Sequence, residues 1–286
     1  MQIGVVFPQT EIGDDPVVIR DFAQAAEGLG YSHLLAYDHI LGADRSNRDR
    51  ELAGGYGHTS AFHEVFVLYG YLAGLTSRIG LATGVLVLPQ RQTALVAKQA
   101  AEIDILSGGR LRLGVGVGWN FVEYEALNED FSNRGRRQEE QVEVMRALWR
   151  EPVVDYTGRW HRIDRAGLLP LPSRQIPVWF GGWSDPAYER AARIGDGFIV
   201  SGNRDPVAGI GAVRSQLAAV GRDPAGFGFD VVTGYGDPGR WVADAEAFRG
   251  LGATHLTFRT MDAGFANPSE HLDALARYMK AVGELT

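Results

Sequence analysis

The sequence predicts an α/β protein built as a (β/α)8 barrel, and three observations support this fold class. Eight short apolar or β-branched runs alternate with helical patterns along 286 residues, which is the length and order of such a barrel. Five Asp-Pro or Asn-Pro pairs each open a helical pattern. Glycine is abundant, with 37 residues, and glycines close several predicted strands. An open, doubly wound parallel sheet is the alternative arrangement.

The predicted strands are each followed by a helical pattern. Strands that alternate with helices pair in parallel, because a crossover helix returns the chain to the same edge of the sheet. The predicted strands are Ile3–Phe7, His33–Tyr37, Ile79–Leu88, Leu111–Val117, Val178–Gly181, Gly197–Val200, Phe229–Thr233 and His255–Phe258.

The helical patterns have recognisable starts. Asp or Asn before Pro caps a helix, since the side chain accepts from free amides and Pro at the first position has no N–H. These pairs are Asp15-Pro16, Asp185-Pro186, Asp205-Pro206, Asp237-Pro238 and Asn267-Pro268. The clearest helical patterns are Val17–Leu29, Glu64–Leu75, Ala94–Leu106, Gln138–Trp149, Ala187–Ile194 and Leu272–Val282.

No linker or change of composition divides the chain, so we expect residues 1–286 to form a single domain. Two connections are long for a barrel, namely Leu41–Ser60 and Glu151–Ile176. Unusually long loops in compact domains tend to be functional, and we expect these two to contact or cover the substrate.

Composition and charge exclude several classes of function. The chain has no cysteine, which excludes disulfide scaffolds, iron–sulfur sites and cysteine nucleophiles. The formal charge is −7, from 28 basic and 35 acidic residues, and nucleic-acid binding needs clustered Lys and Arg. No signal peptide and no apolar run of about 18 residues is present. We therefore expect a cytoplasmic protein that binds neither nucleic acid nor a membrane.

Asp38 and His39 follow the second predicted strand, at the end of the barrel where active sites are built. A histidine there can exchange a proton near neutral pH. Adjacent residues on a strand point to opposite faces, so Asp38 need not orient His39. The alternative is structural: Asp38 caps the following loop and His39 packs against it.

The fourth predicted strand ends in Gly114-Val-Gly-Val-Gly-Trp-Asn120. A dinucleotide fingerprint G-x-G-x-x-G is excluded, because Trp119 and Phe121 stand where its last glycine belongs. The glycines either let the strand pack closely or let a flat ligand or a phosphate lie against bare backbone.

A second glycine-rich end, Gly181-Gly182-Trp-Ser184, runs into a helix start, where exposed amides favour an anion. The turn at Ser201 and Gly202 is similar. Small residues at tight turns are the alternative explanation. Metal ligands are not expected, since His58 and His63 are five residues apart and do not form a helical pair.

Three segments together resemble the luciferase-like monooxygenase superfamily. They are Leu81-Ala-Thr-Gly-Val-Leu-Val-Leu-Pro-Gln-Arg91, Ala97-Lys-Gln-Ala-Ala-Glu-Ile-Asp-Ile-Leu-Ser-Gly-Gly-Arg-Leu111 and Gly114-Val-Gly-Val-Gly-Trp-Asn120. The likeness covers nearly the whole chain. It is nearer to the actinobacterial branch that uses coenzyme F-420 (8-hydroxy-5-deazaflavin) instead of FMN.

The resemblance implies a bacterial luciferase-like TIM barrel with an inserted excursion around Glu151–Ile176, between the fourth and fifth strands. It also implies a bulge in the third strand at Gly84-Val85, often with a cis peptide, that backs the central ring of the cofactor. The implied cofactor-binding residues are Gly84, Val85, Gly116, Gly118, Asn120, Gly181, Gly182, Ser184, Ser201 and Gly202.

For catalysis, the resemblance implies hydride transfer by the cofactor, with His39 as the proton donor or acceptor and Asp38 as a polar group near the ring. Sugar-phosphate dehydrogenases of the superfamily carry an acid where this chain has Trp119. Together with Tyr56, Phe62 and Trp183, this suggests a fairly apolar substrate pocket.

The expected function is therefore F-420-dependent hydride transfer to or from a small alcohol, ketone or enone. An FMN-dependent monooxygenase that uses reduced flavin and O₂ is the alternative, and a non-catalytic flavin-binding barrel is a second one. Family likeness also predicts a homodimer.

Overall fold

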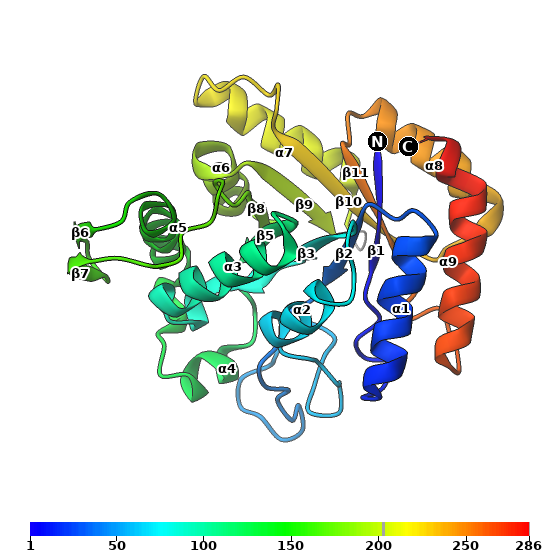
Figure 1. The fold of residues 1–286 in the computed structure, drawn as a ribbon, viewed down its shortest axis with the longest axis horizontal. Coiled ribbons are helices and arrows are strands. Elements are labelled where there is room, and N and C mark those ends of the chain that lie inside the picture. The colour runs from blue at the N-terminus through cyan, green and yellow to red at the C-terminus, as the bar shows by residue number, and fades with distance from the viewer. Residues whose placement is uncertain (202–203, 286) are drawn as a thin grey trace.

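The computed structural model describes residues 1–201 and 204–285, and over these residues eight parallel strands close into a barrel (Figure 1). Pairing of β3 with β5 and of β11 with β1 completes the ring. This confirms the predicted (β/α)8 barrel and excludes the open sheet. Around the ring the strands are β1 (Gln2–Val6), β2 (His33–Ala36), β3 (Gly80–Thr83) continued by β4 (Leu86–Val87), β5 (Leu111–Gly116), β8 (Val178–Gly181), β9 (Gly197–Ser201), β10 (Gly228–Gly234) and β11 (His255–Arg259).

The prediction of one continuous strand over Ile79–Leu88 is wrong, because this strand is interrupted in its middle. The ladder stops after Thr83 and resumes at Leu86, and the Gly84–Val85 peptide bond between them is cis, as the family likeness implies. A 3-10 turn, Leu88–Gln90, follows β4 at once.

Helices surround the barrel, and their starts follow the predicted capping chemistry. Asp15 and Asp205 each accept a hydrogen bond from the amide two residues on. Asp185 is an exception, because it lies inside its helix and Ser184 takes the cap position. The helices are α1 (Pro16–Gly28), α2 (Val65–Ala73), α3 (Thr93–Ser107), α4 (Phe121–Ala126), α5 (Arg134–Arg150), α6 (Asp185–Ile194), α7 (Pro206–Ala219), α8 (Trp241–Gly250) and α9 (Pro268–Val282).

The predicted excursion is an antiparallel hairpin of β6 (Val154–Thr157) and β7 (Arg162–Ala166), which lies beyond α5 (Figure 1). Glu140 on α5 holds its turn, because this carboxylate accepts from the amides of Arg159, Trp160 and His161. The hairpin is thus fixed to α5, outside the barrel.

The barrel interior is divided into an apolar part and a charged part. At the amino-terminal ends of the strands, Asp230 is fully buried and pairs with Arg112 at 2.6 Å and with His33 at 3.2 Å. Burial alone would raise the pKa of Asp230, but Arg112 and His33 hold it well below its usual range. The apolar part consists of Val6, Leu35, Ala82, Trp179, Ile199, Val232 and Met261.

Candidate active site

His39 lies just beyond β2, at the carboxyl-terminal end of the barrel strands, and is half-buried. Three aromatic rings surround its imidazole: Phe62 at 4.9 Å, Trp119 at 5.3 Å and Tyr56 at 5.6 Å between ring centroids. Gly54 lies against the Trp119 ring, since a Cβ there would be 2.4 Å from it. Three of the four predicted pocket residues therefore meet at the predicted proton carrier.

Glu123 on α4 fixes the imidazole and was not found from the sequence. Its Oε2 lies 3.0 Å from His39 Nδ1, and its Oε1 accepts from the amides of Ile40 at 2.6 Å and Leu41 at 3.1 Å. The carboxylate is only 1% exposed. A buried carboxylate with three donors holds the chain after β2 against α4.

Asn120 supports the same connection. It caps α4 by accepting from the Val122 amide at 3.2 Å, and it donates to the Leu41 carbonyl at 3.1 Å. Asn120 and Glu123 have the spacing of a capping box, a signal that could have indicated this helix. Here, however, Glu123 reaches the residues after β2 instead of the cap. The predicted contact of Asn120 with a cofactor stays a prediction.

Asp38 points away from His39 into a buried ion pair. Its Oδ1 accepts from Arg91 at 2.6 Å and its Oδ2 from the Val87 amide at 2.8 Å, while Arg91 also pairs with Glu64 at 2.8 Å. Burial raises the pKa of Asp38, against the opposing effects of Arg91 and of the Val87 amide. Asp38 thus joins the end of β2 to β4 and α2, and its predicted role beside the ring stays a prediction.

Val85, the residue after the cis bond, is enclosed by glycines of neighbouring strands. A Cβ on Gly116 would lie 2.4 Å from one Val85 methyl carbon, and a Cβ on Gly181 would lie 2.7 Å from the other. Gly118 has a φ of +62° and approaches Val87 in the same way. These glycines let β5 and β8 pack closely on the bulge, and Val85, Gly116 and Gly181 form one small apolar floor.

The floor and the imidazole belong to one end of the barrel. Val85, Tyr37 and Tyr56 all pack against the apolar part of the barrel interior, and Tyr56 also contacts His39. Arg259, at the end of β11, is near both tyrosines, and its positive charge acts to lower the pKa of each hydroxyl. Burial raises the pKa of Tyr56. Arg259 was not found from the sequence, because β11 carries no motif there.

The β8–α6 turn has the geometry of an exposed helix start. Gly182 has a φ of +147°, and a Cβ on it would lie 2.9 Å from Ala187. Ser184 is exposed and its side chain makes no capping bond, in contrast to the caps of α1 and α7. Its hydroxyl is therefore open to solvent at the helix start, where an anion is favoured.

Trp183 lies apart from the three rings around His39. It is 53% exposed, and the Arg204 guanidinium is 5.3 Å from its ring. Ser201 ends β9 and its carbonyl accepts from the Arg204 amide. Gly202 lies outside the described residues. Trp183 therefore flanks the β8–α6 turn.

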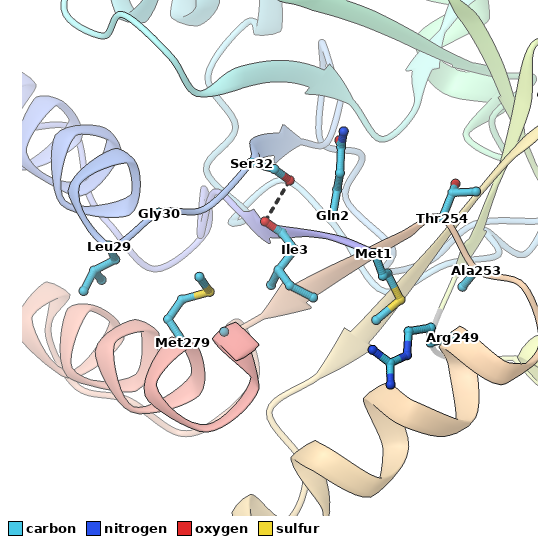
Figure 2. Close-up of a pocket in the computed structure, with 11 residues that line it drawn as sticks. Met1, Gln2, Ile3, Leu29, Gly30, Ser32, Arg249, Ala253, Thr254 and Met279 are labelled. Carbon is cyan, nitrogen blue, oxygen red and sulfur yellow. Dashed lines mark hydrogen bonds between the residues drawn. The ribbon is translucent and has the colours of Figure 1, made fainter. Parts of the chain in front are cut away.

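The opposite end of the barrel carries an open pocket of about 760 Å³ (Figure 2). Met1, Ser32, Thr254 and Met279 are among the side chains that line it. The Ser32 hydroxyl donates to the carbonyl of Ile3 beside it. None of the predicted site residues lines this pocket, so it is separate from the site around His39.

Within residues 1–201 and 204–285, no three His, Asp or Glu side chains are grouped so as to hold a metal ion. Within the same residues, no helix is long and apolar enough to cross a bilayer.

Comparison with known proteins gives several relatives. An uncharacterized protein of Mycobacterium tuberculosis is 36% identical over 208 residues, 70% of each chain. The FMNH(2)-dependent dimethylsulfone monooxygenase of Pseudomonas fluorescens is 31% identical over 70% of this chain and 52% of its own. The F-420-dependent glucose-6-phosphate dehydrogenase of Segniliparus rotundus is 30% identical over 80% of this chain and 68% of its own.

A solved structure has the same fold at low sequence identity. It is an F-420-dependent secondary alcohol dehydrogenase in complex with an F-420-acetone adduct, with a TM-score of 0.78, 17% identity and 98% of both chains covered. The family model described as luciferase-like monooxygenase matches residues 1–235. The chain thus belongs to the luciferase-like monooxygenase family and is an oxidoreductase of the flavin- or deazaflavin-dependent type.

Proposed function

We propose that the protein is a coenzyme F-420-dependent oxidoreductase that transfers a hydride to or from a small, fairly apolar alcohol, ketone or enone. One observation carries this proposal. The His39 imidazole is held by a buried carboxylate, walled by three aromatic rings, and placed at the same barrel end as the floor formed by Val85, Gly116 and Gly181.

The residues present fit a flat tricyclic ring. Glycine at 116 and 181 lets the Val85 side chain pack against β5 and β8, and this valine presents an apolar surface against which an aromatic face can lie. The exposed helix start at Ser184 suits the phosphate of the cofactor's side chain. When bound, the deazaflavin accepts or donates a hydride.

The chain's own residues manage the proton. In alcohol oxidation, the C–H electron pair leaves as hydride, the C=O bond forms, and His39 takes the hydroxyl proton. In the reverse direction His39 returns it. Tyr56, Phe62 and Trp119 exclude water and favour an apolar substrate, and Trp119 replaces the acid implied for sugar-phosphate dehydrogenases.

An FMN-dependent monooxygenase is the second candidate, because the dimethylsulfone monooxygenase is as similar in identity as the dehydrogenase. Both cofactors present a flat ring and a phosphate, and the floor suits either. A non-catalytic flavin-binding barrel is less well supported, because the two relatives compared above are both oxidoreductases.

A parallel titration of the purified protein with oxidised F-420 and with FMN, followed by absorbance and fluorescence, tests the cofactor. We expect micromolar or tighter binding of F-420 and at least tenfold weaker binding of FMN, a difference of about 1.4 kcal/mol. The reverse preference would replace hydride transfer with oxygen chemistry.

We also propose that two copies pair through α2 and α3. These helices contact each other and leave large apolar side chains exposed, with Val67 71%, Leu106 66% and Leu95 52% accessible. Large apolar side chains exposed on two adjacent helices are the kind of surface that a second copy would cover. Light scattering of Val67→Glu should give a monomer where the unchanged protein gives a dimer.

A further inference from the structure

We propose that Glu123 is a positioning residue that fixes the tautomer of His39, with the proton on Nδ1 and with Nε2 as the atom that exchanges a proton with the substrate. The assignment of Nε2 to the substrate rests on the proposed function. The tautomer itself does not, and it can be measured without turnover.

The carboxylate geometry supports this assignment. An ionised carboxylate only accepts hydrogen bonds, so Oε2 at 3.0 Å from His39 Nδ1 requires a hydrogen on Nδ1. The second oxygen is occupied, because Oε1 accepts from Ile40 and Leu41. Two backbone donors on Oε1 hold the Glu123 side chain in one orientation.

Within the described part of the chain, the other ring nitrogen of His39, Nε2, makes no hydrogen bond. The bond from Nδ1 is the one hydrogen bond that its ring makes to described residues. In a neutral imidazole with hydrogen on Nδ1, Nε2 has a free lone pair. The Nε2 atom is therefore the one available to a substrate hydroxyl.

The other groups around the ring do not compete for Nδ1. Tyr56, Phe62 and Trp119 contact the ring by their aromatic faces or edges. Asp38 is adjacent in sequence, but Arg91 and the Val87 amide occupy its oxygens. Glu123 is thus the carboxylate that faces His39 from the packed elements.

A consequence for chemistry follows. As an alcohol is oxidised, its hydroxyl proton passes to Nε2, and the resulting imidazolium is stabilised by the Glu123 carboxylate at Nδ1. As a ketone is reduced, the imidazolium donates from Nε2. One buried carboxylate therefore serves both directions without touching substrate.

The test is ¹⁵N NMR of histidine-labelled protein, with the His39 signals assigned by their loss in His39→Asn. At alkaline pH, where the ring is neutral, we expect the Nδ1–H form in the unchanged protein. In Glu123→Gln, the side-chain oxygen can still accept from Ile40 and Leu41, while the amide nitrogen donates to Nδ1. The proton should then move to Nε2.

Turnover provides the second readout. With the tautomer reversed, kcat should fall about 100-fold or more, while the Kd for F-420 stays within about threefold. Glu125→Gln is the matched control, because Glu125 also lies on α4 but is exposed. In this variant the tautomer of His39 and the kcat should be unchanged.

An Nε2–H form in the unchanged protein would overturn the proposal, even if Glu123→Gln failed to fold. An unchanged tautomer in a folded Glu123→Gln would overturn it as well. If instead the Nδ1–H form is found but His39→Asn keeps full turnover, the proposed function fails and the positioning by Glu123 stands.

Discussion

Two neighbouring residues after β2 have different environments, and this separates their roles. His39 lies among aromatic rings at the barrel mouth, whereas Asp38 is 3% exposed and paired with Arg91. Both residues follow β2, and their side chains make contacts on different sides of the chain. Substitution at the two positions should consequently affect different properties.

Replacing His39 with Asn removes the imidazole that we propose as the proton carrier but preserves a polar side chain. We expect kcat to fall by about 100-fold to 10,000-fold, since general acid–base catalysis contributes that much. Binding of F-420, measured by fluorescence titration, should change little. Undiminished turnover would exclude His39 as the proton carrier.

Replacing Asp38 with Asn should chiefly lower stability. Arg91 then loses the buried negative charge that it faces at 2.6 Å and keeps one ion pair, with Glu64, so the free energy of unfolding should fall by about 3 kcal/mol in urea titrations. Asp21→Asn is the control, because its pair with Arg20 is exposed and should contribute under about 1 kcal/mol. Equal losses of unfolding free energy in the two variants would contradict a stabilising role of the buried Asp38–Arg91 pair.

At the scale of elements, the β3–β4 bulge depends on the strands beside it. Gly116→Ala should lower the free energy of unfolding by about 1–3 kcal/mol, because its Cβ would press on Val85. It should also weaken F-420 binding. Adding Val85→Ala removes the methyl groups concerned and should restore most of the loss, as measured by urea unfolding and cofactor titration.

A glycine outside the bulge serves as the control for this pair. Gly211 lies in α7 with open space around its Cβ direction, so Gly211→Ala should stabilise the protein by up to about 1 kcal/mol. If the losses of unfolding free energy from Gly116→Ala and Val85→Ala simply add in the double variant, the new Cβ at position 116 does not press on Val85.

Most elements could be predicted from local signals, and the site only in part. Asp15 and Asn267 set helix starts through contacts within three residues, which a sequence displays directly. Glu123 and His39 are 84 positions apart, and their contact arises only because β2 and β5 end at the same side of the barrel. The interruption of β3 depends on packing against Gly116 and Gly181, which no local pattern encodes.

At the scale of the whole molecule, the free energy of unfolding should depend on pH through the hydrogen bonds that join Glu27 on α1 to the turn before β3. Burial acts to raise the pKa of Glu27, but the amides of Ile79, Arg78 and Ser77 outweigh it and lower the pKa to about 2. The folded pKa lies below the ordinary value of 4.5. The stabilisation is therefore complete above pH 4.5 and is lost as pH falls toward 2.

Glu27→Gln should thus cost about 1 kcal/mol at pH 7, less than the ~3 kcal/mol of the full shift, since the group is largely solvated. In urea titrations the difference from the unchanged protein should be nearly the same at pH 5 as at pH 7, and clearly smaller at pH 3. Glu246→Gln, at an exposed position on α8, should show no such trend. If the difference in unfolding free energy between Glu27→Gln and the unchanged protein does not change with pH, the Glu27 carboxylate does not contribute the predicted stability.

The anchoring of His39 to α4 has a consequence for how new specificities arise. Tyr56 and Phe62 come from the long connection after β2, whereas His39, Glu123 and the floor are held by the barrel and α4. Tyr56 and Phe62 can therefore vary while Glu123 still fixes the His39 imidazole, whereas Leu52 and Gly54 of the same connection pack against Phe121 and Trp119. Relatives that share this barrel are then expected to differ in substrate through substitutions at Tyr56 and Phe62, with the pair of His39 and Glu123 unchanged.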